Sequence, residues 1–219
     1  MNAIGAEPND WDKHFILVND VNLAQYTGTQ FNIIGIDPYL GTPFTGVFDG
    51  NDHKIWNFTW SSTGRNDIGL FGNLGSGGHI KNLGMENVDV NAVNGWHVGG
   101  LVGTNSGTIR DCYAVATVDG EGCVGGLVGW GGGKVRYSFW DIETSDQSTS
   151  AGGTPKTTIQ MKTMSTFTEA GWDFVEVWGI GEGQTYPFLR TEPAGDSNYD
   201  KKVDLIDLAI LASHWLEGK

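Results

Sequence analysis

The sequence GLVGTNSGTIRDCYA, at residues 100–114, decides the fold of this chain. Its first four letters recur as GLFG at 69–72 and as GLVG at 126–129, and a weaker copy, GVFD, stands at 46–49. A β-branched residue follows the end of each copy by six or eight positions; these residues are Ile55, Ile80, Ile109 and Val135. The copies begin 23, 31 and 26 residues apart, and self-similarity at this period is typical of stacked structural repeats.

The composition of the repeats indicates strands and tight turns. The repeated segments are rich in valine, isoleucine and glycine and lack a helical apolar period. Glycine makes up 34 of the 219 residues, about twice its usual share. Because glycine fits tight corners and close backbone contacts, the sequence predicts an all-β fold with many corners.

Residues 100–114 resemble the GLUG repeat of bacterial surface and secreted proteins. Residues 126–137 resemble it nearly as well, and residues 80–83 more loosely. The family is associated with large extracellular proteins, including the non-catalytic part of some IgA-specific metallopeptidases. The resemblance implies a parallel β-solenoid, or β-helix, and it implies no chemistry.

An aromatic segment precedes the regular repeats. Trp56, Phe58 and Trp60 alternate with Ile55 and its neighbours, and a strand places alternate side chains on opposite faces. If Ile55 points inward, the three aromatic side chains face outward. They are then either a strip for stacking sugars, to which Trp96 or Trp130 would add, or a surface that a loop covers.

Polar residues mark the corners of the predicted coils. Asn57, Asn82 and Asp111 each stand two positions after a β-branched residue, where they would stack as a ladder that Tyr137 interrupts. The two cysteines, Cys112 and Cys123, are either bonded between neighbouring coils or two buried small apolar side chains.

The segment 196–207 has the spacing of a calcium-binding loop. Oxygen-bearing side chains stand at loop positions 1, 3, 5, 9 and 12, and position 7 offers a backbone carbonyl. Calcium is a hard cation that takes six to eight oxygen ligands. The predicted Ca²⁺ ligands are Asp196, Asn198, Asp200, Lys202 (through its carbonyl), Asp204 and Asp207.

Residues 195–216 resemble one half of a dockerin. The resemblance implies calcium binding and docking onto a cohesin-like partner. Two features depart from the family pattern: Lys201 stands at loop position 6, where glycine is usual, and a single half is present where the family pairs two.

The helix that follows the loop, at 208–217, is apolar around almost its whole circumference. Such a helix must be buried, either on the chain's own cap or in a groove on another subunit or partner. The predicted partner-binding residues are Leu205, Leu208, Ile210, Leu211, Trp215 and Leu216.

Four consecutive parts follow from these patterns. They are a β-solenoid at 1–137 with irregular coils at 1–40, a C-terminal cap at 138–190, a linker at 191–195, and a dockerin-like calcium loop and helix at 196–219. Irregular ends are expected because the ends of a solenoid must cover exposed strand edges. Within the cap, Thr157 or Thr158 begins a short helix that runs to about Phe167.

Charge and hydropathy restrict the partners and the location. The net charge of −13 and the pI of about 4.5 argue against nucleic acid as a partner. The chain contains no run of 18 apolar residues, so the sequence predicts no membrane span. Its first residues lack the features of a signal peptide; we expect an extracellular or cell-surface protein whose natural start is missing.

The sequence contains no recognised catalytic motif. The five histidines do not form His-Glu-x-x-His, and neither Gly-x-Ser-x-Gly nor a phosphate loop occurs. The predicted function is a non-catalytic structural or adhesive solenoid that docks or self-assembles, for example into a fibre, through its calcium-stabilised helix. The alternatives are a carbohydrate-binding module tethered to a larger assembly, and a polysaccharide-degrading enzyme. In such an enzyme, the acidic and histidine residues that could form the catalytic site are Asp49, Asp52, His53, Asp67 and Glu86.

Overall fold

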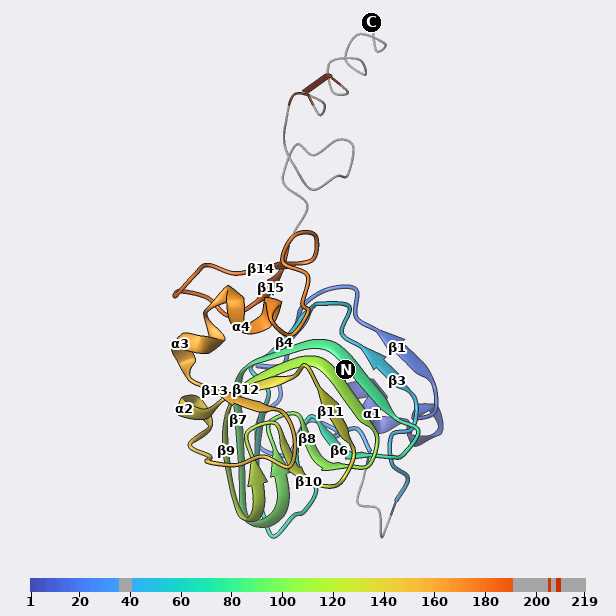
Figure 1. Cartoon of the computed structure of the whole chain (residues 1–219). Helices are drawn as coiled ribbons and strands as arrows, with labels where there is room; N and C mark the ends of the chain where they lie inside the picture. Colours follow the sequence, from blue (N-terminus) through green and yellow to red (C-terminus); the bar gives the residue numbers. More distant parts are fainter. Residues whose placement is uncertain (36–40, 191–204, 206–207, 210–219) are drawn as a thin grey trace, which may run out of the picture.

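The computed structural model describes residues 1–35, 41–190, 205 and 208–209. The described chain is mostly strands, coiled into a parallel β-solenoid of about four turns (Figure 1). This confirms the predicted fold class. The strands are β1 (His14–Ile16), β2 (Val21–Asn22), β3 (Val47–Asp49), β4 (Lys54–Trp56), β5 (Thr59–Thr63), β6 (Phe71–Leu74), β7 (His79–Gly99), β8 (Val102–Asn105), β9 (Thr108–Gly125), β10 (Val128–Trp130), β11 (Lys134–Arg136), β12 (Phe139–Asp141), β13 (Thr154–Lys156), β14 (Trp178–Gly179) and β15 (Phe188–Leu189).

The described helices are short and lie at the ends of the solenoid or beside it. They are α1 (Asn2–Ala6), α2 (Ile142–Ser145), α3 (Thr158–Met161), α4 (Met164–Thr168) and a 3₁₀ helix, η1 (Pro8–Asp10). None of the described helices has the length and hydropathy that a membrane-spanning helix needs.

Several stacks of parallel strands form the walls of the solenoid. β5 with the later residues of β7 and β9 makes one, and faces A, B and C are three others. We call face A the stack of β1, β3, the first residues of β7 and β9, and β11. Face B is the stack of β2, β4, the middle of β7 and β9, β12 and β13. Face C is the separate sheet of β6, β8 and β10. β7 and β9 bend around corners and so contribute to more than one wall.

The core consists of side chains that stack from one coil to the next inside these walls. On face A, Phe48 pairs with Ile80 and Ile80 with Ile109, and all three side chains are fully buried. Phe71 of face C meets Phe48 edge to face, with ring centroids 5.3 Å apart. Burial of such apolar surface is the dominant favourable term in folding.

The structure corrects the register of the first repeat. Val47 pairs with His79, so the GVFD segment at 46–49 belongs to face A and is not a copy of the signature. The counterpart of Phe71 in the first coil is Ile34, which forms a parallel bridge with it. The sequence missed this copy because Asn32 stands in place of the first signature glycine and a long insertion follows Gly35.

The last glycine of the signature is required by close contact between coils. A Cβ atom on Gly103 would lie 2.5 Å from the carbonyl carbon of Asp67, and one on Gly129 would lie 2.5 Å from the backbone nitrogen of Val98. Real Cβ atoms essentially never come so near to backbone. The signature glycines therefore set how tightly successive coils stack.

Residues in the left-handed conformation form the corners, but not as one ladder. Asn82, Asp111 and Tyr137, with φ of 52°, 53° and 52°, turn the chain from face A to face B. Asn57, with φ of 57°, lies instead at the next corner. There its amide donates to Asn22 Oδ1 at 3.0 Å and its own Oδ1 accepts from the amide of Asn87 at 2.5 Å. The predicted single ladder is thus wrong, because Asn57 follows face B and not face A.

Segments at both ends of the solenoid bond to exposed strand edges and loops. At the N-terminal end the side chain of Asn2 accepts from the backbone N–H of Asn32 at 2.6 Å. At the C-terminal end Gln147 donates to the Val118 carbonyl at 2.8 Å, and Ser150 Oγ accepts from the Val128 N–H at 2.9 Å. Such covering satisfies backbone groups that a further coil would otherwise pair.

The cap region covers a side of the solenoid and not only its end. Parallel pairing continues beyond residue 137 through β12 and β13, so the solenoid extends to Lys156. Residues 158–189 then pack over outward-facing side chains of face B and form a second core beside the solenoid (Figure 1). Its buried members are Tyr113, Val115, Phe139, Met161, Phe167, Trp172, Phe174 and Trp178.

The helical part of this cover is shorter than the sequence predicts. Thr157 caps α3 as expected, and its side chain and that of Gln160 form a capping box. The helix ends at Met161, and α4 begins separately at Met164. The predicted single helix to Phe167 is therefore two short ones.

Alanine at the signature glycine tests the close contact between coils. We expect Gly103→Ala to lower the free energy of unfolding by about 1–3 kcal/mol, because the added methyl group overlaps backbone that cannot move without separating the coils. Gly132→Ala is the matched control, since nothing lies within 4 Å of a Cβ there, and it should change stability by less than about 0.5 kcal/mol. Urea denaturation measures both; equal effects would contradict the contact argument.

Candidate functional site

The predicted calcium loop lies outside the described residues. This holds for Asp196, Asn198, Asp200, Lys202, Asp204 and Asp207, and for Ile210, Leu211, Trp215 and Leu216 of the following helix. Within the part of the chain that the structure describes, no group of three or more acidic, histidine or cysteine side chains could hold a metal ion. The loop therefore stays a prediction.

Two predicted partner-binding residues are described. Leu205 and Leu208 are helical, and their exposed fractions are 81% and 61%. The partner-binding role predicted for this helix therefore stays a prediction.

The predicted aromatic strip is not a strip. Trp56 is partly exposed, at 38%, but Phe58 is fully buried and Trp60 is only 5% exposed. The left-handed conformation of Asn57 turns a corner between β4 and β5, so the alternation of the strand does not continue across it. The expectation that all three aromatic side chains face outward is therefore wrong for Phe58 and Trp60.

Two other tryptophans are more exposed than Trp56. Trp96 is 49% exposed and lies against Gly122 on the next coil, where any side chain would collide with its ring. Trp130 is 51% exposed and stacks on His97, with ring centroids 5.1 Å apart and planes 23° apart.

A buried carboxylate holds His97, and through it Trp130, in place. His97 Nδ1 lies 3.1 Å from Oδ1 of Asp67. The same oxygen accepts a hydrogen bond from the Thr104 hydroxyl. Trp130, stacked on the fixed ring of His97, therefore forms a rigid and exposed aromatic surface. Such a surface can stack on a planar ligand or on a sugar ring.

The candidate catalytic residues do not converge. His53 Nδ1 lies 3.1 Å from Asp20, whereas Glu86 pairs with Lys54 at 3.0 Å and accepts from the Tyr113 hydroxyl at 2.5 Å. Asp49 pairs with Lys81 on face A at 2.6 Å. His53 and Glu86 are linked only indirectly, through Asp20 and Lys54, whereas Asp49 and Asp67 lie in separate contacts with Lys81 and His97.

Asp141 joins the cover to the solenoid. Its buried carboxylate caps α2 by accepting from the backbone N–H groups of Glu143 and Thr144, and it accepts from the hydroxyls of Thr158 and Tyr186. Burial, together with this hydrogen bond to a carboxylate, raises the pKa of Tyr186. Tyr186 therefore stays protonated and serves as a structural donor.

The two cysteines are not bonded to each other. Cys112 is buried opposite Leu83 in the core, as the apolar interpretation predicted, but Cys123 is exposed at a corner. Burial raises the pKa of the Cys112 thiol. Cys112 is therefore an inert core side chain.

Charged side chains on the outer side of face A form an arrangement that was not predicted from the sequence. One residue before and one residue after each inward-facing core residue, the strands place side chains in two rows that run from coil to coil. The first row is His14, Val47, His79, Thr108 and Lys134. The second row is Ile16, Asp49, Lys81, Arg110 and Arg136.

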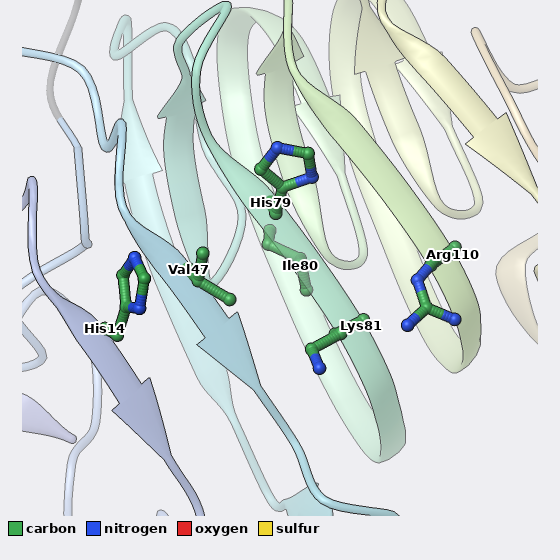
Figure 2. Close-up of a pocket in the computed structure, with 6 residues that line it drawn as sticks. All are labelled: His14, Val47, His79, Ile80, Lys81 and Arg110. Carbon is green, nitrogen blue, oxygen red and sulfur yellow. The ribbon is translucent and has the colours of Figure 1, made fainter.

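These rows border a groove of about 430 Å³. Figure 2 shows the residues that line it on four neighbouring strands: His14 on β1, Val47 on β3, His79 and Lys81 on β7, and Arg110 on β9. The tripeptides His79–Lys81, Thr108–Arg110 and Lys134–Arg136 carry the signal in the sequence. Each tripeptide is centred on one of the equivalent residues Ile80, Ile109 and Val135, so aligning the repeats would have found it.

Asp49 is the one acidic member of the two rows. Burial by itself would raise the pKa of its carboxyl, but hydrogen bonds from Lys81, from the Asn51 N–H and from Asn82 outweigh it and hold the pKa below its usual value. The carboxylate therefore holds the Lys81 side chain in place, and it stabilises the adjoining turns through its hydrogen bonds with Asn51 and Asn82.

Comparisons with known proteins agree with the repeat architecture. Residues 94–119 match the family model described as the GLUG motif. The chain is similar to a protein named as a Gly-rich membrane protein of Evansella cellulosilytica, at 46% identity over 118 residues, which is 48% of this chain and 14% of that protein. It is also similar to halomucin of Haloquadratum walsbyi, at 35% identity over 121 residues, which is 54% of this chain and 1% of halomucin. No solved structure matches.

The lowered pKa of Asp49 predicts a pH-dependent contribution to stability. The contribution is complete above the ordinary carboxyl value of 3.8 and is lost as the pH falls through the lower pKa of the folded state. At neutral pH we expect Asp49→Asn to cost about 1 kcal/mol, and this difference from the unmodified protein should vanish at the most acidic pH at which the protein still folds. Denaturation across the acidic range measures it.

Asp119→Asn is the matched control. Asp119 is exposed, and the structure shows no ion pair for it among the described residues. Its substitution should leave the acid dependence of stability unchanged. If the difference in stability between Asp49→Asn and the unmodified protein persists undiminished in acid, the pH-dependent contribution assigned to Asp49 is wrong.

Proposed function

We propose that this chain is a non-catalytic structural unit of an extracellular or cell-surface protein. The observation that carries the proposal is the parallel β-solenoid with its GLUG motif. The names of the two relatives, a membrane protein and halomucin, support a surface location, and neither name states an enzymatic activity. Because the chain spans only 14% and 1% of those relatives, it corresponds to one part of proteins of that size.

The C-terminal segment serves as the attachment device in this proposal. Calcium bound at 196–207 stabilises the helix that follows, and that helix docks onto a partner or onto another copy of the chain. A cohesin-like or cell-surface protein is the partner class that the dockerin resemblance suggests.

Features of the solenoid ends favour attachment through the C-terminal segment over stacking of solenoids end to end. β11 ends face A among the described strands, and its outward side chains are Lys134 and Arg136. Charged side chains on an edge strand oppose pairing with another copy. The bonds of Asn2, Gln147 and Ser150 occupy further edge groups.

Calcium-dependent association tests this proposal. Light scattering on the full chain should show larger species with excess calcium than with a chelator. Asp200→Ala with Asp204→Ala should abolish the difference, because calcium loses two carboxylate ligands. Leu208→Asp with Leu211→Asp should abolish association while calcium binding, measured by titration calorimetry, remains.

The matched control for the loop is Asp10→Ala with Glu169→Ala. It removes two exposed acidic side chains far from the loop in the sequence and should leave the response to calcium intact. If the chain binds no calcium, the attachment device is wrong. If the chain binds calcium and stays monomeric, self-association is wrong. The same helix variants then test whether a different partner protein binds the helix.

A carbohydrate-binding module is the second candidate function. The observation that favours it is the exposed Trp130, which stacks on His97, whose ring is held by the buried Asp67. Trp96, on the same coil as His97, is a second exposed tryptophan. Aromatic faces of this kind stack on sugar rings. Trp56 remains a candidate of the same kind at another corner of the solenoid.

Retention on columns of neutral glycans tests this second candidate. If this aromatic surface binds sugar, Trp130→Ala should weaken binding by about fivefold or more, as for a residue that dominates an interface. Ile159→Ala is the control, since it also removes an exposed apolar side chain, 76% exposed, in the lateral cover. Equal retention of the unmodified protein and Trp130→Ala would exclude this aromatic surface as the site.

A further inference from the structure

Face A gathers positive charge in a protein that is otherwise strongly acidic. The net charge is −13, yet four of the 13 lysines and arginines stand in the two rows of face A. They are Lys81, Arg110, Lys134 and Arg136, and the first row adds His14 and His79. The outer side of face A therefore has the opposite charge to the molecule as a whole.

Part of this charge has no ionic partner within the described chain. Lys81 pairs with Asp49, and Arg110 pairs with Asp111 at the adjoining corner. Lys134 and Arg136 form no ion pair among the described residues. Both are exposed, so their charges are available to an anionic ligand.

The cations repeat with the geometry of the solenoid. Parallel strands lie about 4.8 Å apart, so each row offers one side chain per coil at that interval along the axis. The two rows are separated by two residues of a strand, roughly 7 Å. A groove lined by Val47, His79 and Lys81 lies between them (Figure 2).

We propose that face A binds a single extended chain of an anionic polysaccharide, laid along the axis of the solenoid. Carboxylates or sulfates of the polymer pair with Arg110, Lys134 and Arg136, and its sugar rings lie over the apolar Val47 in the groove. Charge complementarity and the presence of cations on three neighbouring strands, β7, β9 and β11, carry this inference. It is independent of the C-terminal attachment segment.

Protection of the sheet edge explains only part of the pattern. Cations on β11 oppose pairing with another strand, because β11 is an edge strand. Lys81 and Arg110, however, stand on β7 and β9 where each is paired on both sides. Edge protection gives no reason for cations there, whereas a ligand track along the whole face does.

The shape of the track favours a polysaccharide over the other anionic partners. Duplex DNA is a broad cylinder, and binding it would bring the acidic remainder of the protein close to phosphates. A second copy that docked face A on face A would set like charges against each other, which opposes association. One extended polymer chain fits the two rows alone.

Binding of polygalacturonate to the full chain tests the proposal, with dextran as the neutral control polymer. We expect polygalacturonate to bind and dextran not to bind. With these three contacts, the affinity should fall by up to roughly 20-fold between about 50 and 200 mM salt, by the counterion-release slope for single-stranded polyanions. The triple variant Arg110→Gln, Lys134→Gln, Arg136→Gln keeps none of the three contacts, and any remaining binding should depend little on salt over the same range.

Two further variants separate the track from net charge. The triple variant Arg65→Gln, Lys156→Gln, Lys162→Gln removes as many cations, none of which stands in the rows of face A, and it should bind like the unmodified protein. Asp49→Asn releases Lys81 from its carboxylate partner and should bind more tightly. Thermal unfolding of each variant confirms that it is folded before binding is compared.

Several outcomes would overturn the proposal. Polygalacturonate that does not bind at low salt, or that binds the face A triple variant unchanged, removes the track. Tighter binding of duplex DNA than of polygalacturonate would make the face a nucleic-acid surface. If the face A triple variant instead lowers the mass measured by light scattering without added polymer, the face is an interface between copies.

Discussion

Backbone-to-backbone contact between successive coils is the constraint on which the rest of this structure depends. At Gly103 and Gly129 the neighbouring coil comes so near that a single methyl group has no room. This contact fixes the distance between coils and the register of their strands, and the register decides which side chains lie next to each other. The stacked core of Phe48, Ile80 and Ile109, the two rows of face A and the corner pairs all follow from that one spacing.

The walls of the solenoid differ in what covers them. Outward side chains of face B are large and apolar, such as Tyr113 and Phe139, and residues 158–189 bury them in a second core. Outward side chains of face A are mostly polar or charged, and Arg110, Lys134 and Arg136 among them are exposed. A small solenoid thereby stabilises itself on one side through a lateral cover and leaves another side for contact with ligands. The buried Asp141, which binds both α2 and Tyr186, holds the cover in position.

Attachment and ligand binding are assigned to different parts of the chain. The proposed attachment uses the segment after residue 195, and the proposed polysaccharide track uses face A. A solenoid can combine both because each coil contacts only its neighbours, so one surface can vary without altering the remainder. In an acidic molecule with one basic track, polyanions would be attracted to the track and repelled by the other surfaces.

The sequence by itself determined the fold class, the position of the signature copies at 69, 100 and 126, and the corners at Asn82 and Asp111. Each of these depends on a local pattern within a few residues. The sequence also predicts the calcium loop, because its ligands stand within twelve consecutive positions. Only the tertiary structure decided that Phe58 and Trp60 point inward, since one left-handed residue, Asn57, reverses the alternation. Only the tertiary structure decided that the cations of face A stay uncovered, because residues 158–189 pack over face B instead.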